Sequence, residues 1–241
     1  MTHIFSSIST VIIFAIFYAG SISCSDSACG QGETEHATYE TGEFSKIELR
    51  VPGKVFLKQS DEYAVEIDAP EKILDKIETE IINGVLTISA EPSMFQNIKD
   101  VSMHISLPVL ESLTISGSNK LVGKGTFASD QTDFYIDGSG TLDLDLDNQE
   151  TNVYINGSGN VSLTGKSLKH YIEINGSGNV TNYELITETT GIEINGAGNC
   201  EVYASKTLST EINGAGSVSY KGKPSTTNFD RNGIGMIKSV D

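Results

Sequence analysis

Apolar and polar residues alternate through the second half of the chain, and the alternation repeats with a period of about 19 residues. Each copy has a strand-like segment, a Gly-rich corner and a second strand-like segment. The clearest corners are IDGSG at 136–140, INGSG at 155–159 and 174–178, and INGAG at 194–198 and 212–216. A fixed period with strands on both sides of a corner predicts a solenoid in which every copy forms one coil.

The alternation also predicts which side chains are buried. Around Asn156 the residues three and one before it and five and seven after it are apolar, namely Val153, Ile155, Val161 and Leu163. A strand period of two places these four side chains on one face and the residues between them on the other. The same inward positions are not apolar at Gly123, Asn182, Thr210, Arg231 and Ser239.

The segments are rich in β-branched residues and lack a 3.6-residue period, which argues against helices. We predict an all-β fold, a parallel β-helix with coils about 4.8 Å apart, because reversing hairpins would not need identical corners at a constant period. At each corner, Asn tolerates a left-handed backbone and Gly adopts it freely. The corner side chains would stack as a structural ladder of amide hydrogen bonds, formed by Asn156, Asn175, Asn195 and Asn213.

Upstream of the repeats, residues 41–112 alternate less regularly. We expect a short helical turn at 70–77 and a loop at 94–100. Strand-like alternation occurs in five segments, at 46–51, 55–58, 63–68, 85–89 and 101–107. We interpret them as irregular coils that lead into the regular repeats of 113–241, so that 41–241 forms one domain. A separate small β domain is the alternative.

The N-terminal segment predicts export. Residues 1–23 contain no Asp, Glu, Lys or Arg, and their apolar run at 11–19 is too short to span a bilayer, as in a signal peptide. Small residues then lead into Cys24, as in a bacterial lipobox. We expect a lipid on Cys24 that anchors the protein to the membrane, with the outer membrane as its location. Cleavage after Ser23 without lipidation is the alternative. The polar residues 24–40 predict a flexible tether.

The charge balance of the chain limits the classes of partner that it can bind. The chain of 241 residues has 16 Lys and Arg against 32 Asp and Glu, a net charge of −16. Nucleic acids are held by basic side chains that neutralise phosphates, so this balance excludes a nucleic-acid partner.

Cys24, Cys29 and Cys200 form neither a disulfide framework nor a metal-binding pattern. Cys200 occupies an inward position, and we expect a buried thiol.

Two outward columns are candidate binding sites. Tyr135 and Tyr154 would stack on adjacent coils and provide a platform for a ligand such as a sugar ring. Four carboxylates occupy equivalent positions on successive copies: Glu173, Glu193, Glu211 and Asp230. Stacking would bring these like charges close together, which is unfavourable. A bound Ca²⁺ would offset the repulsion, whereas a solvated acidic face screened by salt, which we favour, needs no metal.

Three upstream motifs, FSKIEL at 44–49, NGVLTIS at 83–89 and SLPVLESLTI at 106–115, together with the repeated corners, resemble the head GIN domain family. This family is described as auto-transporter adhesin heads. The resemblance covers about residues 41–238. It implies a right-handed β-helix and a location in the cell envelope, and it brings no catalytic residues.

We therefore favour a non-enzymatic envelope lipoprotein whose rigid head binds a surface polymer or protein. The alternative is a β-helix enzyme that degrades polysaccharides, either a lyase or a carboxylate-based glycosidase. A lyase needs basic residues to hold a uronate, and Arg231 is the only Arg of the repeats. A glycosidase would depend on Asp133, Asp137 and Asp143, which lie near one corner in the sequence. We expect no cofactor apart from the Ca²⁺ considered above.

Overall fold

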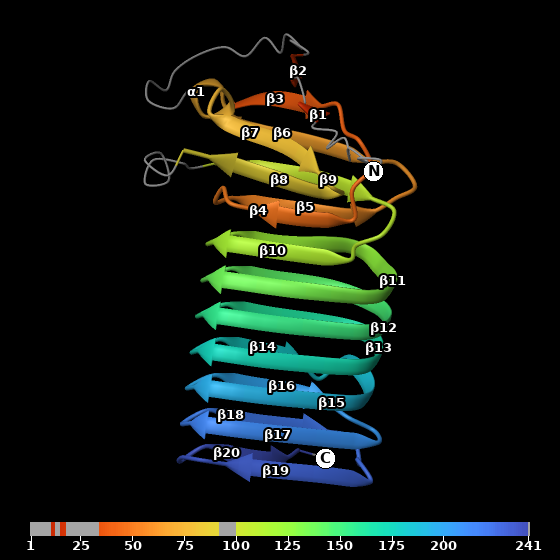
Figure 1. The fold of residues 1–241 in the computed structure, drawn as a ribbon, viewed down its shortest axis with the longest axis vertical. Coiled ribbons are helices and arrows are strands. Elements are labelled where there is room, and N and C mark those ends of the chain that lie inside the picture. Colours follow the sequence, from red (N-terminus) through yellow and green to blue (C-terminus); the bar gives the residue numbers. More distant parts are fainter. Residues whose placement is uncertain (1–10, 13–14, 18–33, 92–99, 241) are drawn as a thin grey trace, which may run out of the picture.

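The computed structural model describes residues 11–12, 15–17, 34–91 and 100–240. From residue 112 onward the chain winds into stacked coils with a front wall and a rear wall (Figure 1). The front wall contains β10 (Ser112–Gly117), β17 (Thr207–Gly214), β19 (Thr226–Arg231) and the last residues of β11 (Lys120–Gly138), β12 (Thr141–Gly157), β13 (Asn160–Gly176) and β15 (Leu185–Gly196). The rear wall contains the first residues of β11, β12 and β13, and β14 (Asn179–Asn182), β16 (Asn199–Tyr203), β18 (Ser217–Lys221) and β20 (Met236–Ser239).

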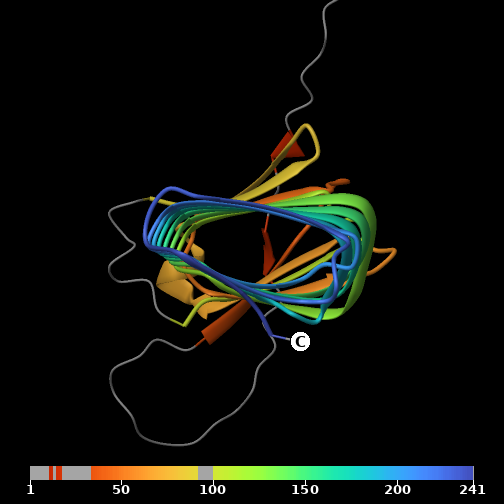
Figure 2. The ribbon, with the colours of Figure 1, turned by 90° about the horizontal axis from the view of Figure 1, so that it is seen from below.

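Adjacent coils pair in parallel and in register. One inward column consists of Ile115, Ile136, Ile155, Ile174, Ile194 and Ile212. The front strands run leftwards in Figure 1 while the chain descends, so the coils are right-handed. Viewed along the axis, they superpose as one flattened, closed outline (Figure 2). The predicted parallel β-helix is confirmed.

The predicted inward positions form the core. Between residues 113 and 220 all of them are buried except Gly123 and Tyr220, and none of the outward positions between them is buried. A Cβ at Gly123 would clash with Cδ2 of Leu144 in the next coil and would lie 2.8 Å from Cε2 of Phe127. The space of the missing side chain is therefore filled by Leu144 and by Phe127. The register shift in β11 just before it accommodates the extra residues of this coil.

The last coil departs from the predicted pattern. Phe229 is 45% exposed, Arg231 and Ser239 are exposed, and Ile237 is only partly buried, although the repeat assigns all four to the inside. Within the described chain no further coil pairs with the free edges of β19 and β20. The inner face of a solenoid is buried by the coils on both sides, so the end coil stays open.

The corners turn at glycine, and the expectation of left-handed asparagine is wrong. Among the described residues other than glycine, positive φ occurs at Asn83 and Asp100 alone. At Gly176 φ is +140°, and a Cβ would lie 2.3 Å from the carbonyl oxygen of Gly157 in the preceding coil. Backbone conformation and stacking both require glycine there.

The upstream coils stack out of sequence order. β4 (Lys46–Leu49) and β5 (Lys54–Gln59) form one coil, and β8 (Val85–Ala90) and β9 (Ser102–Leu107) form another. The β4–β5 coil pairs with β8 and β9 on one side and with β10 and β11 on the other. The segment 108–111 therefore passes the β4–β5 coil to reach β10, and the core continues through these coils.

Antiparallel strands cover the N-terminal end. β6 (Ala64–Pro70) lies between β9 and β3 (Thr34–Tyr39), and β7 (Ile77–Ile82) pairs with β8. The expected helical turn is α1 (Glu71–Leu74). The five predicted upstream strands are present, whereas the sequence pattern did not predict β3 or β7. The prediction of a flexible tether over 24–40 is wrong for residues 34–39, because they form β3, pair with β6 and bury Ala37 and Tyr39.

Little of the predicted export segment is described. Its described residues, β1 (Val11–Ile12) and β2 (Ala15–Phe17), pair with β7 and β3. Cys24 and Cys29 lie outside the described residues, as does the predicted loop apart from Asp100. Export and lipidation therefore stay predictions. In the part of the chain that the structure describes, no helix has the length and hydrophobicity to cross a membrane.

Candidate functional site

The corner asparagines form a continuous hydrogen-bond ladder along the surface. Nδ2 of Asn175 donates to Oδ1 of Asn156 at 3.2 Å, and Asn195 and Asn213 repeat the contact with the preceding coil at 3.1 and 3.0 Å. Asn156 in turn donates to Asp137 at 2.8 Å. The ladder is exposed or half-buried. Because each bond joins one coil to the coil before it, the ladder favours the in-register stacking of the corners.

A second ladder runs parallel to the first, and our reading of the sequence missed it. Nδ2 of Asn179 donates to Oδ1 of Asn160, and Asn199 donates to Asn179, both at 3.1 Å. Ser217 closes the column by donating from Oγ to Asn199. The available signal was the Asn that follows the second corner glycine in three consecutive copies.

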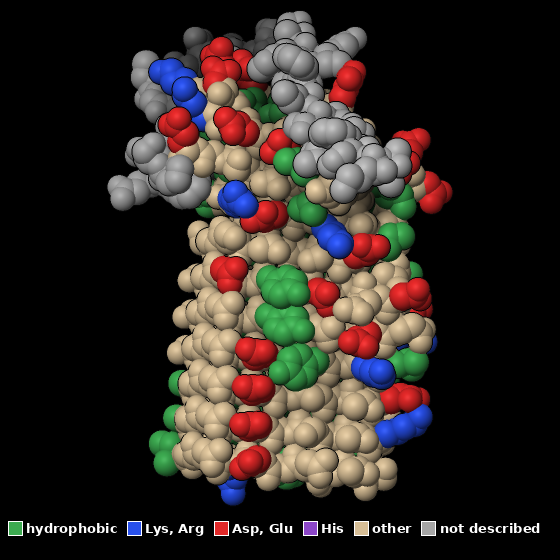
Figure 3. All heavy atoms as spheres, viewed as in Figure 1, with side chains coloured by type: hydrophobic (Ala, Val, Ile, Leu, Met, Phe, Trp, Pro, Cys, Tyr) green, Lys and Arg blue, Asp and Glu red, His purple; other side chains and the backbone are tan. Residues whose placement is uncertain are grey.

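The four predicted carboxylates form a straight acidic column on the front wall (Figure 3). Its members stack in register on successive coils: Glu173, Glu193, Glu211 and Asp230. Oε1 of each glutamate accepts a hydrogen bond of 2.9 to 3.0 Å from the corner Asn two residues later, which fixes its side chain. Among the described residues no group of three or more His, Cys, Asp or Glu is arranged to hold a metal. Bound Ca²⁺ stays a hypothesis.

The two predicted tyrosines stack, and a third joins them. The rings of Tyr135 and Tyr154 are 4.9 Å apart between centroids with planes 9° from parallel, and Tyr171 follows at 5.9 Å with a 56° tilt. These distances are typical of attractive aromatic pairs. We call Tyr135, Tyr154 and Tyr171 the tyrosine strip. Figure 3 shows a short column of hydrophobic side chains beside the acidic one on this face.

Tyr171 was missed because it lies two residues before the column that holds the other tyrosines. Its hydroxyl donates to Oε2 of Glu193 at 3.3 Å. Gly191 stacks on Tyr171 in the next coil, and a Cβ there would lie 3.2 Å from the ring. Burial, and then the carboxylates of Glu193 and Glu173, raise the pKa of Tyr171 to about 12. The phenol therefore stays protonated at neutral pH and serves as a donor.

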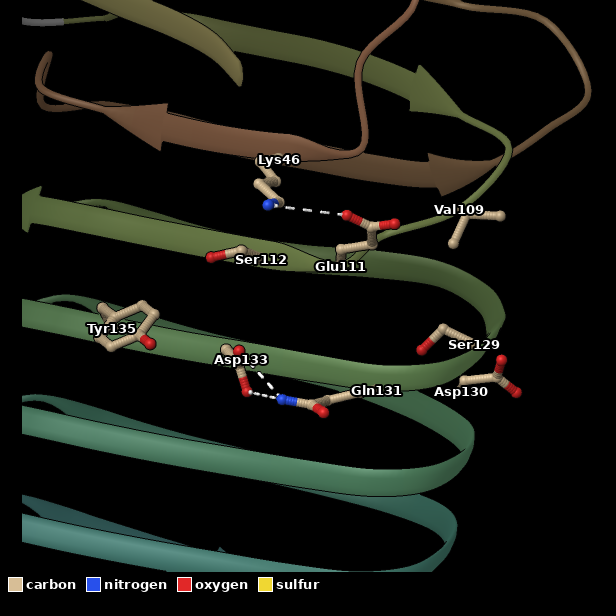
Figure 4. A pocket seen from close by; sticks show the side chains of 9 residues that line it. All are labelled: Lys46, Val109, Glu111, Ser112, Ser129, Asp130, Gln131, Asp133 and Tyr135. Carbon is tan, nitrogen blue, oxygen red and sulfur yellow. Dashed lines mark hydrogen bonds and ion pairs between the residues drawn. The ribbon is translucent and has the colours of Figure 1, made fainter. Parts of the chain in front are cut away.

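A hollow of about 480 Å³ lies on the front wall beside Tyr135 (Figure 4). We call it the upper hollow. Polar groups from three coils surround it: Lys46, Glu111, Ser112, Gln131 and Asp133. Nζ of Lys46 lies 3.9 Å from Oε2 of Glu111. Nε2 of Gln131 donates to both oxygens of Asp133 at 3.0 and 3.2 Å. Donors and acceptors of hydrogen bonds thus surround the opening.

A second hollow, of about 580 Å³, begins at Tyr171 and extends past Gly191 and Glu193 to Glu211 and Phe229. We call it the lower hollow. Tyr135 lines the upper hollow and Tyr171 lines the lower one, so the tyrosine strip connects the two. The strip and both hollows together form what we call the front-wall site.

The structure separates the three aspartates on which a glycosidase would depend. Asp133 lines the upper hollow. Asp143 lines a different hollow, with Asp145, in the rear-wall part of β12. Asp137 accepts the first hydrogen bond of the corner ladder. The three aspartates flank one corner, but the corner sends β12 onto the opposite wall, so Asp133 and Asp143 do not face a common site.

The filled solenoid, with its repeated chemistry on the outer surface, defines the chain as a β-solenoid with an outward-facing candidate binding site. Residues 43–224 match the family model described as "Putative auto-transporter adhesin, head GIN domain". The chain belongs to this family, which confirms the resemblance that the motifs indicate.

Solved structures share the fold. A "putative adhesin" from Bacteroides fragilis is 25% identical, with a TM-score of 0.82 over 86% of this chain and 97% of that one. A "putative lipid binding protein" from Parabacteroides distasonis is 19% identical, with a TM-score of 0.69 over 88% and 98% of the two chains. A "putative adhesin" from Parabacteroides merdae is 17% identical, with a TM-score of 0.67 over the same shares. No curated protein matches the chain.

Proposed function

We propose that the protein is a non-enzymatic binding module of the cell envelope, anchored by a lipid on Cys24, whose rigid head adheres to a surface partner. One observation carries the proposal. Side chains fill the interior of the solenoid, so its fixed and repeated chemistry lies on the outside, above all in the front-wall site. Membership of the adhesin-head family and the likeness to the "putative adhesin" from Bacteroides fragilis support this role.

The architecture suits adhesion through a preformed surface. Consecutive coils are joined by parallel pairing and by two Asn ladders, so the head loses little conformational freedom when it binds. Evenly spaced groups on a rod favour several weak contacts with an extended partner. Residues 34–39 of the predicted tether form β3, so residues 24–33 remain as the candidate flexible chain, which would give the head a reach of roughly 16–19 Å from the membrane.

The anchor is tested by labelling cells with a fatty-acid analogue and separating membrane from soluble fractions. We expect the wild-type protein to carry label and to sediment with membranes, and Cys24→Ala to lose both. Cys29→Ala is the matched control, since it removes a thiol from the same tether and should change neither. A soluble, unlabelled wild-type protein that begins at Cys24 would contradict the anchor.

Adhesion is tested with beads that carry the full chain, compared with beads that carry an unrelated acidic protein. We expect only the former to accumulate on bacterial or host cell surfaces. The same incubations are assayed for release of sugar reducing ends. Absence of adhesion would refute the binding role. Release of sugars that Asp133→Asn abolishes would instead identify a glycosidase.

A further inference from the structure

We propose that the front-wall site binds an uncharged polysaccharide chain that lies along the rod, across the coils. The inference deepens the proposed binding role by naming its ligand class, and it rests on that role. It begins from continuity. The upper hollow reaches Tyr135, the stacked ring of Tyr154 follows on the next coil, and Tyr171 on the coil after that opens the lower hollow.

The chemistry along this path matches a sugar polymer. Aromatic rings pack well against the apolar C–H faces of pyranose rings, since the ring face is electron-rich. Hydroxyl groups need acceptors and donors beside that platform. The upper hollow offers the carboxylates of Glu111 and Asp133 and the ammonium of Lys46. The lower hollow offers Glu193, Ser209 and Asn228. Both hollows have an aromatic side with polar groups next to it.

The platform is held in place before any ligand arrives. The Tyr135 and Tyr154 rings stack on each other, and the Tyr171 hydroxyl is bonded to Glu193. Oε1 of Glu193 accepts from Nδ2 of Asn195 at 2.9 Å, so the ladder fixes that carboxylate in turn. Gly191 leaves room for the Tyr171 ring on the surface of the next coil. Little side-chain freedom is therefore left to lose on binding.

Other polymers fit the site less well. A polyanion would meet the acidic column and a net charge of −16. An extended peptide binds sheets by pairing with a free strand edge, but this path runs across strands that already pair with the coils on both sides. A ligand that lies across the coils can contact side chains but no unpaired backbone groups. A glycan can bind in this way, because aromatic rings contact its C–H faces and polar side chains bind its hydroxyl groups.

The test applies the full chain to an array of uncharged, anionic and amino-bearing polysaccharides. Calorimetry with a six-unit oligosaccharide of the best-bound polymer then gives Kd. We expect an uncharged polymer to bind best, with a Kd that hardly changes between low and high salt and rises strongly for the single sugar. Tyr154→Ala should weaken binding roughly tenfold or more, whereas Tyr154→Phe keeps the ring and should stay close to wild type.

Tyr183→Ala is the matched control. Tyr183 lies just after β14 of the rear wall, with Nζ of Lys221 4.7 Å from its ring centre, so its loss should leave Kd unchanged. Thermal melting of each variant shows that it is folded. The proposal is overturned if no uncharged polymer binds, or if folded Tyr154→Ala binds as tightly as wild type. It is also overturned if a cationic polymer binds best and salt releases it.

The bead assay separates this inference from the proposed function. If beads adhere to cells while every uncharged polysaccharide fails, the protein is an adhesin and the ligand class is wrong. If the oligosaccharide binds the tyrosine strip while beads do not adhere, the binding site is right and the adhesive role is wrong.

Discussion

Asn182 donates a hydrogen bond from Nδ2 to Nε2 of His170 at 2.9 Å inside the solenoid. The other ring nitrogen, Nδ1, donates to the carbonyl oxygen of Thr151 at 2.9 Å, and Oδ1 of Asn182 accepts from the amide of Leu163. When His170 is neutral, each of the four polar side-chain atoms of this pair, Nδ1 and Nε2 of His170 and Nδ2 and Oδ1 of Asn182, has a hydrogen-bond partner. Asn182 breaks the apolar pattern of the repeat, and this partnership is its physical reason.

His170 makes stability depend on pH. Burial lowers the pKa of His170 to about 4, despite its bond to Thr151, whereas an unfolded His titrates near 6.5. Between these values the unfolded state binds the extra proton, so the free energy of unfolding falls as pH falls from about 7 towards 4. We expect this residue alone to contribute a loss of about 2 kcal/mol between pH 7.5 and 5.

The measurement is urea unfolding of wild type and His170→Gln at both pH values. The two proteins share every carboxylate, so the difference between their pH slopes isolates His170. Above pH 7 His170 contributes no slope in wild type, so the stabilities of the two proteins should depend on pH in the same way there. If the free energies of unfolding of the two proteins fell equally between pH 7.5 and 5, the assignment of a neutral, buried imidazole would be contradicted.

Asn175→Ala interrupts the first ladder at its middle. It removes the bonds to Asn156 and Glu173 and the acceptor of Asn195. These partners are near the surface and regain water, so we expect a loss of about 1 kcal/mol in the free energy of unfolding. Thr181→Ala, an exposed β14 residue outside the ladders, is the control. An unchanged urea midpoint would show that the ladder adds nothing to stability.

Gly176→Ala should cost more than its neighbour Asn175→Ala. The added Cβ would clash with the Gly157 carbonyl oxygen, and the alanine would have to adopt a φ of +140°, which is strained for any residue with a side chain. We expect a loss of about 2–4 kcal/mol, measured by the same urea titration. Gly42→Ala is the control, because nothing lies within 4 Å of a Cβ there. Equal midpoints for both glycine variants would refute the stacking argument.

Cys200 should resist thiol reagents until the protein unfolds. It lies between Val180 and Val218 in an inward column, is 1% exposed, and burial raises the pKa of its thiol. A variant with Cys24→Ala and Cys29→Ala leaves it as the sole thiol. We expect no reaction with a chromogenic disulfide in buffer and one equivalent in denaturant. Equal rates in both conditions would contradict burial.

The acidic column should respond to salt and not to chelators. Its glutamates are each fixed by an Asn donor, and their remaining repulsion is screened by ions in solution. We expect EDTA to leave Tm unchanged, and added NaCl to raise Tm more in wild type than in Glu193→Gln. If EDTA lowers Tm in wild type and not in Glu193→Gln, Ca²⁺ occupies the column.

The repeat pattern of the sequence was enough to predict the coils and the columns of stacked side chains. In a solenoid each coil has equivalent neighbours above and below, so one copy of the pattern fixes burial in all of them. The inward isoleucines, the corner ladder, the acidic column and the Tyr135–Tyr154 stack all follow from adding one period. The same logic fails at Phe229, because no further coil among the described residues covers the last one.

The front-wall site, by contrast, depends on contacts that the repeat pattern does not contain. Lys46 faces Glu111 and Asp133 because the β4–β5 coil is inserted between β9 and β10, an order that the sequence period does not contain. Tyr171 joins the strip because its ring leans over Gly191, a choice made by side-chain packing and not by register. Local alternation decides which face of a strand is buried, whereas contacts between distant segments decide which exposed groups meet.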